Sequence, residues 1–71
     1  MKPESVMIIA NGKEEAVGQN CTVAEFVSVH GWKATQVVVE YNGRVLGKKE
    51  LTGTMLNGGD RLEVIVPVAG G

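Results

Sequence analysis

Apolar residues of this chain occur in short runs that are separated by glycine-containing turns. The first run, residues 6–10, is followed by Asn-Gly and then by a weaker run over residues 13–17. Asn-Gly between two such runs predicts a β-hairpin, because both residues accept the positive φ that a tight turn requires. Since side chains alternate between the two faces of a strand, we expect Val6, Ile8 and Ala10 to point into the core.

A helical period replaces this pattern after residue 21. Thr22 and Glu25 are spaced as a capping box, in which each side chain accepts a hydrogen bond from the other residue's amide. Residues at the spacing i, i+3, i+4 and i+7 form one apolar stripe along the predicted helix: Val23, Phe26, Val27 and His30. The pattern predicts a helix over residues 23–30. Gly31 is placed to be its left-handed C-terminal residue, and Trp32 to pack back onto it.

Three further strands are predicted in the second half of the chain: residues 35–41, 44–46 and 61–68. A second Asn-Gly turn joins the first two of them. The segment 47–56 has no clear period, and we expect it to be irregular, with Leu51 and either Met55 or Leu56 pointing inward. Pro67 lacks an amide hydrogen, so strand pairing should end near it.

The element order β-β-α-β-β-β predicts an α+β fold, with one helix packed on one face of a mixed sheet of four to five strands. In the last strand the inward set is wholly apolar: Leu62, Val64 and Val66. The same alternation turns four apolar residues toward the open face: Met7, Ile9, Val38 and Ile65. Because a contiguous exposed apolar patch typically marks an interaction site, we expect a partner to dock there.

The length of 71 residues allows one domain and leaves little room for an enclosed catalytic cavity. We expect this domain to span residues 6–67. Residues 1–5 should be flexible and residues 68–71 should form a mobile tail, since terminal residues are usually poorly ordered unless they are tied down.

Composition and charge exclude several functions. Seven Lys and Arg against eight Asp and Glu give a net charge of −1, without the basic patch that nucleic-acid binding requires. No apolar run is long enough for a secretory signal or a membrane span, and a lone cysteine fits a reducing compartment. We therefore expect a cytoplasmic protein with no membrane association and no nucleic-acid partner.

The sequence also offers little to catalysis. One His and one Cys cannot supply a zinc site, and no phosphate-binding loop is present, so we expect no metal and no bound cofactor. Cys21 and His30 should lie at opposite ends of the predicted helix, roughly 13 Å apart, too far for a nucleophile and its base. We expect Cys21 to be structural, packing against Phe26 as a hydrophobic staple.

The last two residues, Gly70 and Gly71, are the remaining candidates for chemistry. Two residues without Cβ atoms can extend into a narrow channel and present a carboxylate to a nucleotide-binding partner. A free carboxylate is a poor electrophile, but joined to AMP it gains a good leaving group. A sulfur or nitrogen nucleophile can then attack it. The domain would serve as a handle for one carboxylate.

Four stretches together carry a family resemblance: IIANGKE, GQNCTVAEFV, VVVEYNGRVL and NGGDRLEVIVPVAGG. Over residues 6–71 the chain resembles the sulfur carrier proteins of thiamine thiazole biosynthesis, the ThiS family of the β-grasp, ubiquitin-like superfamily. Gly-Asp before the last strand and Gly-Gly after it are the most telling pair. The chain departs from the family pattern at Pro67 and Ala69, and in GKKELTGT, which lacks a Pro-Arg pair.

The resemblance implies a carrier that is itself no enzyme and is monomeric when free. An adenylating enzyme related to ubiquitin-activating enzymes would consume ATP to activate Gly71, a persulfide donor would supply sulfur, and thiazole synthase would accept it from the thiocarboxylate. Other interpretations stay open: a sulfur carrier for molybdopterin, the tungsten cofactor or tRNA thiolation, a ubiquitin-like protein modifier, or a plain interaction domain. The sequence names neither the sulfur donor nor the acceptor.

Overall fold

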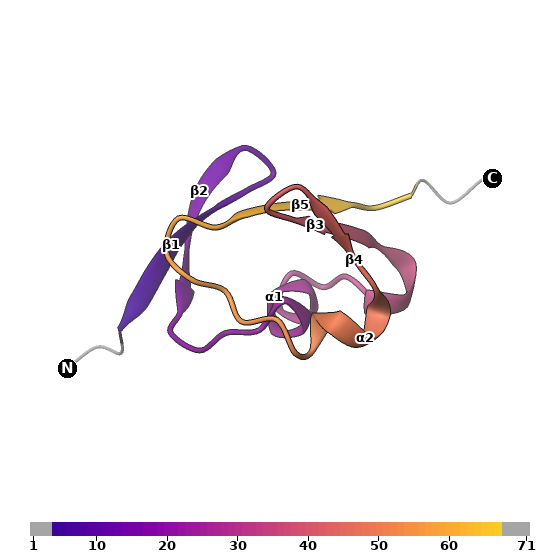
Figure 1. Ribbon diagram of the computed structural model, residues 1–71, viewed down its shortest axis with the longest axis horizontal. Helices are drawn as coiled ribbons and strands as arrows, with labels where there is room; N and C mark the ends of the chain where they lie inside the picture. Colours follow the sequence, from indigo (N-terminus) through magenta and orange to yellow (C-terminus); the bar gives the residue numbers. More distant parts are fainter. Residues whose placement is uncertain (1–3, 68–71) are drawn as a thin grey trace.

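The computed structural model describes residues 4–67, which form one sheet with a helix beneath it (Figure 1). The described strands are β1 (Ser5–Ala10), β2 (Lys13–Gly18), β3 (Val38–Tyr41), β4 (Arg44–Leu46) and β5 (Arg61–Ile65). They pair in the order β2-β1-β5-β3-β4, in which only the β1–β5 pair is parallel. The predicted α+β fold, a mixed sheet with a helix on one face, is confirmed. The predicted mobile tail, residues 68–71, lies outside the described residues, as does most of the predicted flexible N-terminus.

Both Asn-Gly pairs form the predicted two-residue turns. Asn11 and Gly12 have φ of 51° and 83°, and Asn42 and Gly43 have φ of 51° and 87°. Positive φ at both turn positions matches the right-handed twist of the flanking strands, so each hairpin closes without an extra residue. The first hairpin therefore pairs β1 with β2, and the second pairs β3 with β4.

The predicted helix is α1 (Val23–Val29), and both of its ends are built as the sequence indicates. At its start the Glu25 amide donates to Thr22 Oγ1 over 3.1 Å, and the Thr22 amide donates to Glu25 Oε1 over 3.0 Å. At its end the Gly31 amide donates to the Ser28 carbonyl, and the Trp32 amide donates to the Val27 carbonyl. Gly31 has a φ of 82°, so the helix ends in a Schellman motif.

Two short helical segments correct the sequence-based description. A 3₁₀ turn, η1 (Ala34–Gln36), occupies the start of the predicted strand 35–41, so β3 begins only at Val38. The segment 47–56 was expected to be irregular but contains α2 (Lys48–Leu51). The Gly47 amide donates to Glu50 Oε1 over 2.7 Å, which supplies the cap that starts this turn. No helix within residues 4–67 is both long and apolar enough to cross a membrane.

The core lies between α1 and the sheet. Its buried side chains are Ile8, Ala10, Val17, Val23, Phe26, Val27, Val37, Val39, Leu46, Leu51, Leu56, Leu62 and Val64. Leu51 and Leu56 point inward, whereas Met55 is 45% exposed. Val66 was predicted to face the core but is 47% exposed. The last pair of β5 is Val38 with Ile65, and the next residue but one is Pro67, which cannot donate to a ladder, so Val66 lies beyond the sheet.

Candidate functional site

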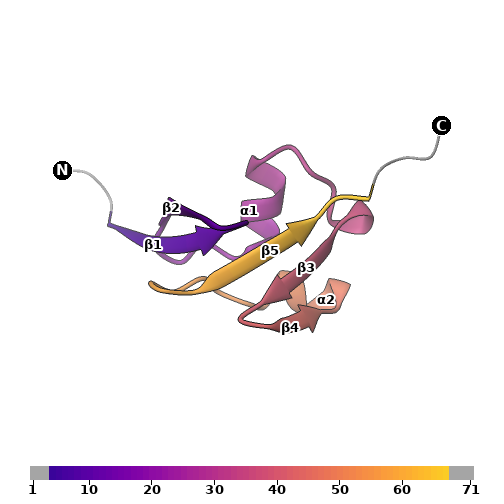
Figure 2. The ribbon, with the colours of Figure 1, turned by 90° about the horizontal axis from the view of Figure 1, so that it is seen from above.

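The strand that leads toward the Gly-Gly pair, β5, lies between β1 and β3 (Figure 2). It is therefore hydrogen-bonded along both edges, parallel to β1 and antiparallel to β3. Two of its side chains, Leu62 and Val64, are buried against the helix side of the sheet. A strand held on both edges and on one face gives the residues after it a fixed point of departure.

Both turn asparagines reach β5 with their side chains. Asn11 Oδ1 accepts a hydrogen bond of 2.8 Å from the Val64 amide, and Asn42 Oδ1 accepts one of 2.8 Å from the Arg61 amide. The β1–β5 ladder would otherwise stop at the turn, because the chain leaves the sheet there. The asparagine side chains thus extend the pairing of β5 beyond the neighbouring strands, one from each side.

Asp60, immediately before β5, accepts three hydrogen bonds. The Tyr41 hydroxyl donates to Oδ2 over 2.8 Å, the Asn57 amide donates to Oδ2 over 2.8 Å, and Asn42 Nδ2 donates to Oδ1 over 3.1 Å. Burial alone raises the pKa of Asp60, but the hydrogen bonds from these three residues outweigh it and hold the pKa below its usual value. The same carboxylate raises the pKa of the Tyr41 hydroxyl, chiefly by accepting its hydrogen bond. The Gly-Asp motif is thus a structural junction.

The four residues predicted to form one docking patch fall into two groups. Val38 and Ile65 are cross-strand partners, 43% and 49% exposed. Met7 is 50% exposed and Ile9 is half-buried, and both lie on β1. Ile9 pairs with Arg61, four residues before Ile65 on β5, so roughly 13 Å of strand separates the groups. The pattern of each strand gives the face that a side chain occupies but not the register between strands.

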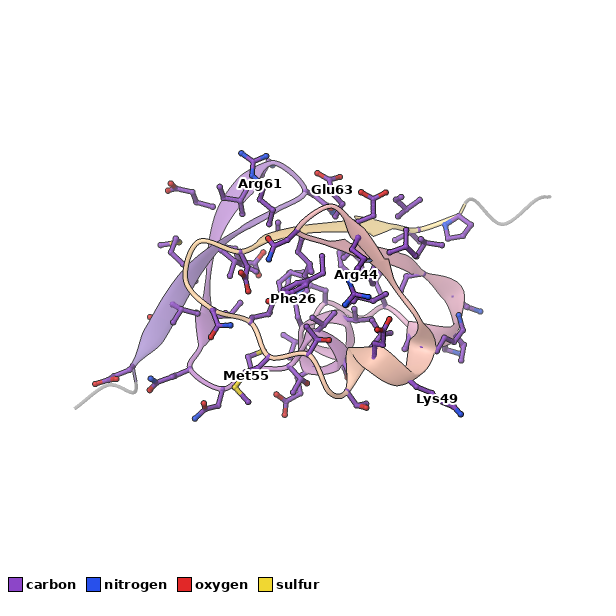
Figure 3. The ribbon with its side chains drawn as sticks, viewed as in Figure 1. Phe26, Arg44, Lys49, Met55, Arg61 and Glu63 are labelled. Carbon is purple, nitrogen blue, oxygen red and sulfur yellow. The ribbon has the colours of Figure 1, made fainter. Side chains whose placement is uncertain are left out.

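Charged side chains lie between the Met7–Ile9 group and the Val38–Ile65 group on the open face of the sheet. A shallow hollow of about 210 Å³ lies there, lined by Ile9, Gly12, Glu40, Gly43, Arg61 and Glu63. Glu40 and Glu63 are direct cross-strand partners, and Arg61 and Glu63 point away from α1 and from the buried Phe26 (Figure 3). The open face therefore has an apolar end near the end of β5 and a charged middle.

Val45 was missed by the sequence-based prediction. It is 57% exposed and pairs with Glu40, so it faces the same side as Val38 and stands diagonally beside it. Counting outward from the two-residue turn would have given this pairing. We call Val38, Val45 and Ile65 the β3–β5 patch.

Cys21 and His30 border one hollow on the helix side of the sheet, yet each has its own partners. The Cys21 thiol donates weakly to the Thr22 carbonyl over 3.4 Å, and its pKa is raised by burial and then by the charge of Glu25. A raised pKa disfavours the thiolate, which is the nucleophilic form. His30 Nε2 lies 2.8 Å from a Glu15 carboxylate oxygen, and its Nδ1 lies 2.9 Å from the Phe26 carbonyl.

The remaining predicted site residues, Gly70 and Gly71, lie outside the described part of the chain. Within residues 4–67, no three His, Cys, Asp or Glu side chains are placed to hold a metal ion together. The role of the Gly-Gly pair stays a prediction from the sequence. The described residues supply the strand that precedes it in the sequence, β5.

Comparisons with known proteins bear on this arrangement. A crystal structure of a thiamine biosynthesis protein (ThiS) from Geobacter metallireducens is 30% identical, with a TM-score of 0.78. The match covers 93% of this chain and all of that one. Ubiquitin from Caldiarchaeum subterraneum is 21% identical, with a TM-score of 0.50, covering 99% of this chain and 100% of that chain. The ubiquitin-like domain of the 4931431F19Rik protein is 18% identical, with a TM-score of 0.55, covering 100% of this chain and 85% of that chain.

The two ubiquitin-like structures show the shared fold alone. A comparison with curated protein sequences gave no match. The sequence model of the ThiS family, in contrast, matches residues 4–71, which is nearly the whole chain and includes the Gly-Gly pair. The chain therefore belongs to the ThiS family.

Proposed function

We propose that this protein carries sulfur as a thiocarboxylate on Gly71 and donates it to the synthesis of the thiazole ring of thiamine. An ATP-dependent activating enzyme joins AMP to the Gly71 carboxylate and releases pyrophosphate. Sulfur from a persulfide donor then attacks the acyl carbon, AMP leaves, and reduction of the remaining sulfur–sulfur bond by a thiol frees the thiocarboxylate. Thiazole synthase accepts that sulfur.

The observation that carries the proposal is the family match, because it runs through residue 71. Membership of the ThiS family supports the general role, a sulfur carrier in thiamine biosynthesis. The structural likeness to a thiamine biosynthesis protein supports the same role. The identity of the reacting group, Gly71, rests on the chemistry of a carboxylate that needs activation and on the narrow shape of a Gly-Gly segment.

The described fold suits a carrier. β5 is held on both edges, and the asparagine links at Val64 and Arg61 secure its two ends. The raised pKa of Cys21 disfavours its nucleophilic thiolate form, and the proposed route carries the sulfur on Gly71 and not on this thiol. The domain therefore acts as a handle, and its partners supply the catalytic groups.

Docking of the activating enzyme on the open face is part of the same proposal. Within the β3–β5 patch, Val38 and Ile65 lie nearest to the end of β5. A partner that covers Met7 and Ile9 as well must also span the charged hollow between the two groups. A cationic side chain of the partner placed over Glu40 and Glu63 would complement that hollow.

The assignment of the Gly71 carboxylate as the reacting group is tested by shortening or lengthening the chain by one residue. Deleting Gly71, or adding one residue after it, should abolish ATP–pyrophosphate exchange with the activating enzyme and leave the far-UV spectrum unchanged. Ala69→Gly is the matched control, because it keeps the length and the last two glycines. Normal exchange by the shortened chain would overturn the assignment of Gly71.

Sulfur transfer itself is tested by mass spectrometry after incubation with the activating enzyme, ATP and a persulfide donor. We expect a mass gain equal to the replacement of one oxygen by sulfur. Conjugates of high mass in place of that gain would indicate a protein modifier.

The docking surface is tested with Ile65→Asp, which keeps Gly-Gly intact. Affinity for the activating enzyme should fall by about 1–3 kcal/mol, the scale of an apolar anchor at an interface. Met55→Asp is the control, because Met55 is similarly exposed but lies on the opposite side of the molecule from Arg61 and Glu63, which share a face of β5 with Ile65 (Figure 3). Val38→Asp should reproduce the loss. Unchanged affinity in both patch variants would place the docking surface elsewhere.

A further inference from the structure

The outer edge of β2 lacks a partner strand among the described residues. β2 is the first strand in the sheet order, and β1 covers only its inner edge (Figure 1). Proteins usually protect such an edge with charges, proline or a bulge. Here Lys13, Glu14 and Glu15 charge one end of the strand, but Ala16, Val17 and Gly18 leave the other end uncharged and free of proline.

The register shows which backbone groups point outward. A two-residue turn closes on Ala10 and Lys13, which exchange both of their backbone hydrogen bonds. Because such pairs alternate with non-bonded pairs, Glu15 and Val17 also bond to β1. The amides and carbonyls of Glu14 and Ala16 must then point away from the sheet. These groups, together with the Gly18 amide, form an open row of donors and acceptors.

A hollow of about 190 Å³ lies directly beside this row, between β2 and α1. Its apolar lining comes from Ala16, Val17, Cys21, Phe26 and Val29. Val29 is 82% exposed although it belongs to the helix that covers the core. A strand added to β2 would direct every second side chain toward α1, and one such side chain would occupy this hollow.

The charged residues around the outer edge of β2 indicate which kind of strand can pair with it. Glu14 is exposed and, among residues 4–67, takes part in no ion pair, while Glu15 is paired with His30. Glu25 lies close enough to raise the pKa of Cys21 on the rim of the hollow. A second copy of the chain would bring the same glutamates, and registers that align residues 14 or 15 with themselves oppose like charges. A basic strand has no such conflict.

We propose that the β2 edge binds an extended peptide segment of a partner protein in which apolar and basic residues alternate. The peptide backbone pairs with Glu14 and Ala16, an apolar side chain enters the hollow beside Val29, and basic side chains face Glu14. This is recognition by strand addition, in which the backbone gives affinity and alternate side chains give specificity. β1 separates β2 from β5, so this partner and one docked on the β3–β5 patch can bind together.

The test is an NMR titration of the ¹⁵N-labelled full chain with acetyl-Lys-Val-Lys-Ile-Lys-Val-amide. We expect saturable shifts that are largest for amides 14–18 and 26–30. The charge-reversed peptide, with Glu in place of each Lys, should bind at least about tenfold more weakly. Saturable shifts centred on Val38 and Ile65, or no saturable shifts at all, would overturn the proposal.

Ala16→Pro removes an outward amide without breaking a bond to β1, so the edge strand should tolerate it. It should weaken peptide binding at least about tenfold, whereas Ala16→Ser, which keeps the amide, should not. Glu14→Lys provides a second variant that leaves the backbone untouched and should reverse the preference between the two peptides. Unchanged binding in both Ala16→Pro and Glu14→Lys would refute strand addition. A dimer in sedimentation that Ala16→Pro dissolves would assign the edge to a second copy instead.

Discussion

The two hairpins use the same Asn-Gly turn but attach to β5 unequally. In the first hairpin the Asn11 side chain makes one link, accepting from the Val64 amide. In the second hairpin the Asn42 side chain makes two, accepting from the Arg61 amide and donating to Asp60. Tyr41, in the strand before the second turn, adds a further hydrogen bond to the same carboxylate.

The difference shows that a turn dipeptide specifies local geometry, whereas its tertiary role depends on what lies opposite. Both asparagines have a φ of 51°, so the two turns require the same backbone conformation at this position. The second turn meets the start of β5, where the Asp60 carboxylate is available as an acceptor. The first turn meets β5 at Leu62 and Val64, where only backbone groups are available. The second hairpin should therefore contribute more to the stability of the strand that leads to Gly-Gly.

The largest effect should come from Asp60→Ala, which removes all three hydrogen bonds at the junction. We expect a loss of about 2–3 kcal/mol in the free energy of unfolding, since bonds to a charged acceptor are stronger than neutral ones. Urea denaturation followed by circular dichroism measures it. Asp60→Asn keeps one carbonyl acceptor and should lose less. Equal stability of Asp60→Ala and the natural chain would show that Asp60 does not secure β5.

Asn42→Gly should have the next largest effect, a loss of about 1.5 kcal/mol in the free energy of unfolding. It removes two side-chain hydrogen bonds, while glycine keeps the positive φ of the turn. Combined with Asp60→Ala, it should cost less than the sum of the two single changes, since the variants share one hydrogen bond. A fully additive double variant would mean that the contact between Asn42 and Asp60 contributes nothing.

Asn11→Gly should lower the free energy of unfolding by about 1 kcal/mol, because a single hydrogen bond from the Val64 amide is lost. Combined with Asn42→Gly, the two losses should add, since the two turns share no partner. Hydrogen exchange should show faster exchange at the Val64 amide in Asn11→Gly and at the Arg61 amide in Asn42→Gly. Faster exchange at both amides in either variant would show that the two turns act as one unit.

The sequence predicts most of what is local in this molecule. The two Asn-Gly turns, the capping box at Thr22 and the left-handed Gly31 follow from residues within one turn of each other. The link from Asn11 to Val64 joins residues 53 apart, and the hydrogen bonds from Tyr41 and Asn42 to Asp60 join residues 19 and 18 apart, so no local pattern contains them. They depend on which strands lie beside β5.

The same limit explains the errors in the predicted surface. Alternation within a strand placed Val38 and Ile65 on the open face, but only the register between strands shows that Met7 and Ile9 lie at the other end. Val66 was assigned to the core because the alternation was continued past the last residue that pairs. The cap of α2 depends on Glu50 folding back to Gly47, which an aperiodic segment does not reveal.

The smallest of the four effects is a change of stability with pH. It tests whether the ionised Asp60 carboxylate is what distinguishes the attachment of the second hairpin from that of the first. The pKa of Asp60 is below its usual value in the folded state, so its contribution to stability is present above the unfolded pKa, about 4. That contribution is lost as the pH falls through the lower, folded pKa. The difference in stability between the natural chain and Asp60→Asn should therefore shrink below about pH 4. Asn11→Gly has no titrating partner at its turn, so its deficit should stay constant over the same range. Thermal denaturation from pH 2.5 to 7, with Asn11→Gly as the control, measures both. A deficit in Asp60→Asn that does not change with pH would mean that hydrogen bonding, and not the charge of Asp60, distinguishes the second hairpin from the first.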